Sequence, residues 1–88
     1  MTLEKVKLSM GISVNALDNE LEALISACRS ELFLSGVDID NNDYTDIIDV
    51  AIINYCKYQK NYQGLSEEYK KIYDSQKSFM MLACKRGL

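Results

Sequence analysis

The sequence predicts an all-α fold, a compact bundle of one short N-terminal helix and three longer helices in a single domain over residues 1–88. Three observations lead to this prediction. The chain contains no proline, apolar residues recur every three or four positions, and glycines or helix-capping residues separate the apolar stretches. A hydrophobic content of 48% is typical of a globular chain, and 88 residues leave room for only one core.

The first predicted helix is short and runs from Leu3 to about Met10, with Leu3, Val6 and Met10 on one side. A single apolar side is typical of a helix that lies on a core. We expect Thr2 to be the N-cap of this helix and Gly11 to end it.

The second predicted helix has the clearest period in the chain. Its apolar residues are Leu17, Leu21, Leu24, Ile25, Cys28 and Leu32. Asn15, followed three residues later by Asp18, resembles a capping box, so we expect the helix to begin there. Gly36 is well placed to stop it.

The third predicted helix follows a polar loop over residues 37–43. We expect Asp43 to cap it, with Asp46 three residues further on. Residues 47–53 are apolar apart from Asp49, and a helix that is apolar nearly all round is normally the buried, central one. We expect this helix to continue as far as Gly64.

The fourth predicted helix begins at Ser66 and extends to about Arg86. One of its faces carries Tyr69, Ile72, Tyr73, Gln76, Phe79, Met80 and Ala83. Lys85 and Arg86 follow at the C-terminal end, where positive charge interacts favourably with the helix dipole.

Charge is divided unevenly along the chain. Residues 1–49 carry ten acids against three bases, a net charge of −7, whereas residues 50–88 carry seven bases against three acids, a net charge of +4. An acidic end and a basic end predict head-to-tail attraction between copies. No apolar stretch is long enough for a signal peptide or a membrane span, so we expect a cytoplasmic chain that makes no membrane contact.

Neither candidate metal site matches the pattern of residues that its metal needs. Asp38-x-Asp40-x-Asn42 matches the start of a calcium-binding EF-hand, but Asp43 stands where that loop needs glycine. The three cysteines form no closely spaced pair and the chain has no histidine, so we expect them to be small buried apolar residues rather than zinc ligands. We expect no cofactor, and with no nucleophile beside a base we expect no catalysis.

Six tyrosines between residues 44 and 73 have two interpretations. They are either a stacking platform for nucleic acid or, as their helical spacing favours, core and interface residues. The residues that we predict to contact partners are Tyr58, Lys60, Tyr62, Met80, Met81, Lys85 and Arg86. Met80 and Met81 belong to an apolar cluster that alternatively closes the core.

A family resemblance narrows the function. The segments that carry it are Val6-Lys7-Leu8…Ile12, Asp18-x-x-Leu21-x-x-Leu24-Ile25-x-Ala27 with Leu32 and Gly36, Ala51-Ile52-Ile53-x-Tyr55, and Tyr73-Asp74-x-x-Lys77. Together they span about residues 3–80, and they resemble the small head–tail connector (head completion or adaptor) proteins of long-tailed bacteriophages and prophages.

The resemblance implies a structural virion protein, present in the host cytoplasm during assembly and then at the virion neck. It implies a homo-oligomeric ring that contacts the portal protein and a stopper or tail-completion protein, and a monomer in isolation is compatible with this role. DNA would pass through the ring without sequence-specific binding, because carboxylates repel phosphates. The candidates for an acidic lumen or a subunit contact are Asp38, Asp40, Asp43 and Asp46.

The alternative is a small helical regulatory or nucleic-acid-binding protein. Its recognition helix would be residues 66–86, which carry Lys70, Lys71 and Lys77 but also three acids. Salt-dependent DNA binding would distinguish this alternative from a connector.

Overall fold

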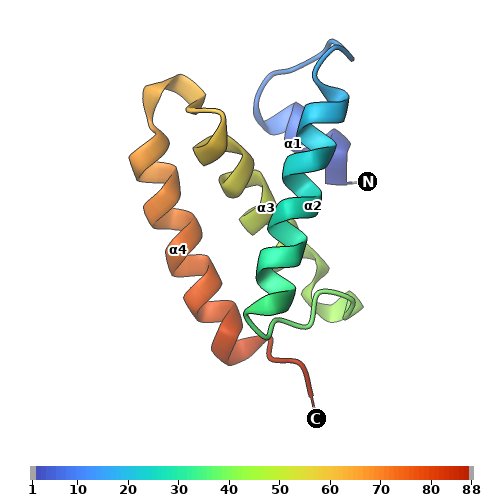
Figure 1. The fold of residues 1–88 in the computed structure, drawn as a ribbon, viewed down its shortest axis with the longest axis vertical. Helices are drawn as coiled ribbons and strands as arrows, with labels where there is room; N and C mark the ends of the chain where they lie inside the picture. The colour runs from blue at the N-terminus through green and yellow to red at the C-terminus, as the bar shows by residue number, and fades with distance from the viewer. Residues whose placement is uncertain (1, 88) are drawn as a thin grey trace.

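The computed structural model describes residues 2–87 and confirms the all-α prediction (Figure 1). Within these residues the chain forms four α-helices, one short and three long, and two 3₁₀ turns. Its only β-type pairing there is an isolated bridge. The elements in order are α1 (Thr2–Ser9), α2 (Asp18–Leu34), η1 (Asn42–Tyr44), α3 (Thr45–Gln59), η2 (Tyr62–Gly64) and α4 (Ser66–Ala83).

Helix α3 is the central element and packs against α1, α2 and α4. Figure 1 shows it passing between α2 and α4, while α1 lies near the start of α2. The apolar side chains that α3 buries are Ile48, Ala51, Ile52, Tyr55 and Cys56. They form one core with the buried face of α2, which consists of Leu21, Ile25, Cys28 and Leu32. The prediction of a central third helix is confirmed.

Within the apolar stretch of α3, residues 47–53, the single polar residue is buried and two of the apolar residues are exposed. Asp49 is 5% exposed, whereas Val50 and Ile47 are 49% and 39% exposed. The carboxylate of Asp49 binds Lys5 Nζ at 2.8 Å and accepts a hydrogen bond from Thr2 Oγ1 at 3.2 Å. Helical periodicity turns Asp49 towards α1 and Val50 towards solvent. A charged contact therefore attaches α1 to the central helix.

The predicted N-caps of α1 and α2 are wrong. Thr2 lies inside α1, and its hydroxyl also accepts a hydrogen bond from Arg29 Nη2 of α2 at 3.1 Å. Helix α2 begins at Asp18 without a side-chain cap. The Asn15 side chain accepts a hydrogen bond from Lys7 Nζ at 3.0 Å, and Lys7 also forms an ion pair with Asp18 at 2.7 Å. These polar residues connect α1 to the start of α2 instead of capping either helix.

Two of the three predicted glycine stops are confirmed. Gly11 and Gly36, with φ angles of 68° and 94°, follow the ends of α1 and α2, and glycine adopts this left-handed backbone without steric cost. Gly64 does not end α3, which stops at Gln59. The cause is Asn61, whose φ of 50° breaks the helix before the η2 turn. Asparagine tolerates this conformation better than most residues.

Helix α4 buries only part of its apolar face. Tyr73 and Met80 are buried, and Tyr69 and Gln76 are half-buried. Ile72, Phe79 and Ala83, which the helical period places on the same face, are exposed. The reason is that α4 packs chiefly against α3. Only the side chains that point towards α3 and α2 are therefore buried.

Replacing Asp49 with alanine is predicted to destabilise the protein by about 1–3 kcal/mol, because Thr2 and Lys5 lose their buried partner. Urea unfolding followed by circular dichroism measures this change. The matched control is Asp40→Ala, which removes an exposed carboxylate and should alter stability by less than about 0.5 kcal/mol. Equal effects of the two variants would show that the Asp49 contact does not hold α1.

Candidate functional site

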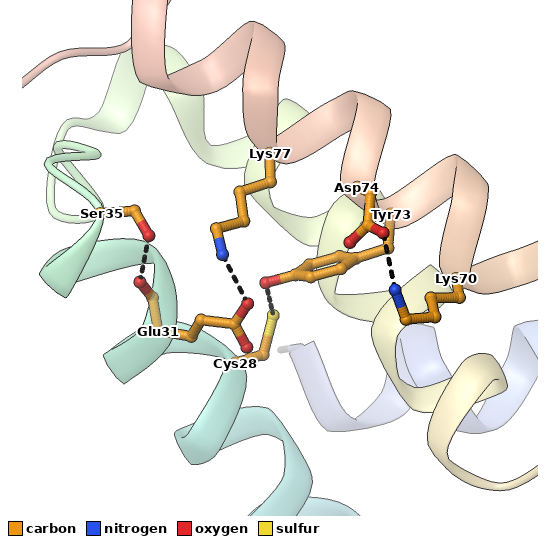
Figure 2. Close-up of polar contacts among 7 residues, drawn as sticks. All are labelled: Cys28, Glu31, Ser35, Lys70, Tyr73, Asp74 and Lys77. Atoms are coloured by element: carbon orange, nitrogen blue, oxygen red, sulfur yellow. Dashed lines mark hydrogen bonds and ion pairs between the residues drawn. The ribbon is translucent and has the colours of Figure 1, made fainter.

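Side chains of α2 and α4 meet along one side of the core (Figure 2). Lys77 Nζ forms an ion pair with Glu31 Oε1 at 2.8 Å, and the Cys28 thiol donates to Tyr73 Oη at 3.7 Å. Ser35 Oγ donates to the Glu31 carbonyl oxygen at 2.9 Å. Burial, followed by the nearby Cys28, raises the pKa of Tyr73 far above its ordinary value. The phenol therefore stays protonated, and the cluster links two helices rather than activating a nucleophile.

The three cysteines are buried thiols, as predicted. Burial raises the pKa of Cys28 to about 12 and the pKa of Cys56 to about 11, and it also raises the pKa of Cys84. The thiolate is the reactive form and the form that ligates metals, so these residues are poor nucleophiles. Among residues 2–87, no group of three or more histidines, cysteines or carboxylates could hold a metal ion.

The predicted acidic candidates are spread along the surface between α2 and α3. Asp38 is half-buried and accepts a long hydrogen bond of 3.5 Å from the Asn41 side chain. Asp40, Asp43 and Asp46 are exposed. Asp43 does not cap α3, which is a further correction, because the N-cap position is occupied by Tyr44. Asp43 lies within the η1 turn, where its backbone N–H donates to Asn41 Oδ1 at 2.9 Å. The structure thus leaves three carboxylates facing solvent, and their lumen or subunit-contact role stays a prediction.

The acidic and basic halves of the chain neutralise each other in part within one molecule. Lys60 Nζ lies 2.6 Å from Glu20 Oε1, and Lys77 pairs with Glu31 in the same way. Both pairs join a base of the second half to an acid on α2. The charge available for attraction between copies is therefore smaller than the sequence suggests.

Most of the predicted contact residues on α3, η2 and α4 are engaged inside the chain. Met80 is fully buried, so it belongs to the core and is not available to a partner. Tyr58 is half-buried and packs edge-on against Tyr55, with ring centroids 6.2 Å apart. Tyr62 is half-buried against Tyr69, and all six tyrosines are at least half-buried. Of the predicted pair of methionines only Met81 is exposed.

The chain's C-terminal segment docks on its own bundle. Lys85 forms an antiparallel bridge with Val37, and Arg86 donates from its backbone to Gly36 O at 2.8 Å. The Arg86 guanidinium binds Phe33 O at 2.8 Å and lies 4.0 Å above the Phe33 ring. Arg86 therefore interacts with the C-terminus of α2, not with that of α4 as predicted. Lys85 stays exposed and remains a candidate contact.

The surface feature that the sequence interpretation missed is a set of exposed apolar side chains. Leu8, Leu34 and Leu82 are each more than 80% exposed, and Phe79 is 56% exposed. Among the described residues, eleven large apolar side chains are exposed in all. The sequence held one indication of this exposure, because Ile72 and Phe79 lie at the edge of the apolar face of α4. A helix on the surface of a bundle buries only the middle of such a face.

The surface of the bundle is hollowed in several places. One lies between α1 and α2 and is lined by Thr2, Leu3, Glu22, Ile25, Ser26 and Arg29. Its arginine is hydrogen-bonded to Thr2, and a glutamate of opposite charge stands on the same rim.

Comparisons with known proteins identify no relative. No protein-family model matches the chain, and neither a curated protein nor a solved structure is detectably similar to it. Within residues 2–87, none of the helices combines the length and the apolar composition that crossing a membrane requires.

Native-state alkylation is predicted to leave all three cysteines unmodified. Burial blocks access, and at about pH 8 the raised pKa values of Cys28 and Cys56 leave almost no thiolate. Mass spectrometry after iodoacetamide treatment measures the labelling. The same protein in concentrated urea is the control, and there all three thiols should react. Rapid labelling of any thiol in the folded protein would contradict this description of the core.

Proposed function

We propose that this chain is a structural subunit without catalytic activity, a head–tail connector of a tailed phage or prophage. In this role copies form a ring between the portal and the tail, and the ring extends the DNA channel. The helical bundle and the sequence resemblance over about residues 3–80 support the proposal. The proposed partners are the portal protein and a stopper or tail-completion protein. The proposed locations are the host cytoplasm during assembly and then the virion neck.

The observation that carries the proposal is the exposure of large apolar side chains on a small bundle. Exposed leucines such as Leu8, Leu34 and Leu82 lie on different helices or helix ends, and a subunit of a ring needs separate surfaces for its two neighbours. Apolar side chains of this kind are buried when a structural assembly forms.

The exposed acids fit the proposed DNA channel. Asp40, Asp43 and Asp46 are close in sequence and face solvent at the start of α3. If this segment faces the lumen, its carboxylates repel DNA phosphates and let the duplex slide. Lys60 and Lys77, by contrast, are paired with acids of the same chain, which leaves fewer bases to hold DNA.

No observation favours the nucleic-acid-binding alternative. Of the three α4 lysines, Lys70 pairs with Asp74 at 3.0 Å and Lys77 pairs with Glu31 at 2.8 Å. Lys71 is exposed, but a single base does not make a phosphate-binding stripe.

Deleting the gene from its parent phage or inducible prophage is predicted to yield DNA-filled heads and separate tails, because the neck lacks its connector. Negative-stain electron microscopy of the lysate measures the share of joined particles. Normal, infectious, tailed particles would refute the proposal.

Complementation extends the same test to the apolar surface. In the deletion strain, a plasmid copy with Leu82→Glu should yield at least about tenfold fewer infectious particles than a wild-type copy. The reason is that a carboxylate in a buried contact costs more than about 1.4 kcal/mol. The matched control is Ser75→Glu, an exposed polar position on the same helix, which should complement fully.

A further inference from the structure

The outward side of α3 carries an unusual stripe. Asp46, Val50, Ile53 and Lys57 follow one another at helical spacings of four, three and four residues. Successive residues of an α-helix are rotated by about 100°, so these four side chains lie within about 60° of each other. Asp46 is exposed and Val50 is 49% exposed, while Ile53 and Lys57 are half-buried. The stripe therefore begins with an acid, has two apolar residues in its middle and ends with a base.

This order is symmetric about the point midway between Ala51 and Ile52. When two copies of α3 lie antiparallel, a two-fold axis at that point places Asp46 of each copy opposite Lys57 of the other. The same axis places Val50 opposite Ile53. A contact of this isologous kind uses the same patch on both subunits. The stripe is thus complementary to itself in charge and in apolar character.

The charged ends are available for such pairing. Asp46 forms no ion pair within the described residues, although it contributes to raising the pKa of nearby Lys5, where Asp49 is the main cause. Lys57 Nζ lies 5.1 Å and 5.3 Å from the ring centroids of Tyr62 and Tyr69. Those rings hold the ammonium in place, and its three N–H donors still allow a carboxylate on the open side.

Exposed apolar residues flank the stripe on the α4 side. Helices α3 and α4 run antiparallel, and the hydrogen bond from Asn54 Nδ2 to Gln76 Oε1, 3.1 Å long, fixes their register. One turn from that bond, Val50 comes level with Phe79, which is 56% exposed. Ile47, which is 39% exposed, lies one turn further along α3 and comes level with Ala83. A second copy that binds the stripe would also cover some of these exposed apolar residues.

We propose that the α3 stripe is a two-fold contact between two copies of this chain. A two-fold contact closes on itself, whereas a ring needs two different surfaces on each subunit. The dimer is therefore a state of the free protein outside the ring, and the inference does not rest on the proposed connector function.

Sedimentation velocity on the full chain, from micromolar to millimolar concentration, tests the dimer. The wild-type protein should shift from monomer to dimer as its concentration rises. Asp46→Lys and Lys57→Glu should each raise the dissociation constant at least about tenfold, because each variant places like charges opposite one another. Val50→Glu, which puts a carboxylate at the centre of the contact, should have the same effect.

Mixing the two charge variants is the most specific test of the pairing between Asp46 and Lys57. An Asp46→Lys chain and a Lys57→Glu chain form two opposite-charge pairs when they meet antiparallel, so the mixture should dimerise although neither variant does alone. Circular dichroism checks that each variant is folded. The controls are Glu22→Lys and Lys71→Glu, which make the same charge changes at exposed positions outside the stripe and should leave the dissociation constant within about twofold.

Three results would overturn the dimer. One is a wild-type protein that stays monomeric at every concentration, and another is a mixture no more associated than its components. The third is association, whether into dimers or into rings, that the stripe variants leave unchanged. Association into rings would agree with the connector function while rejecting this contact, so the two proposals fail separately.

Discussion

The burial of helix α3 is the constraint on which the rest of the structure depends. Every other helix packs against it, and the apolar side chains that it buries form the middle of the core. In a chain of 88 residues no second core is available, so the flanking helices have no alternative surface on which to fold. Even the one acid within its central stretch, Asp49, is used for attachment, because it binds α1 through Lys5 and Thr2.

The elements and the central position of α3 could be predicted because both follow from periodicity within one helix. Residues 47–53 are too apolar for a solvent-facing helix, and glycine stops such as Gly36 are local signals. The N-caps could not be predicted in this way. Asn15 and Asp18 resemble a capping box, but both contact Lys7, which comes from an element that the local pattern does not include. Tertiary contacts of this kind override local preferences.

The candidate surface was harder to predict than the fold. Met80 and Arg86 looked available along the sequence, yet Met80 is buried and Arg86 binds Phe33 at the end of α2. Conversely, Val50 looked like core and is half exposed. The division of charge between the two halves is real, but pairs such as Lys60 with Glu20 neutralise part of it inside one molecule. The orientation of the helices relative to one another decides which side chains stay exposed and can contact a partner. Local sequence patterns do not predict this orientation.

Native-state hydrogen exchange measured by NMR tests the central role of α3 most directly. Amides in the middle of α3, such as those of Ile52 and Tyr55, should exchange most slowly, with an opening free energy equal to that of global unfolding. Amides of α1 and α4 should exchange faster, through openings that leave α3 packed on α2. Slower exchange in α4 than in α3, or loss of α3 protection before that of the flanking helices, would contradict the account.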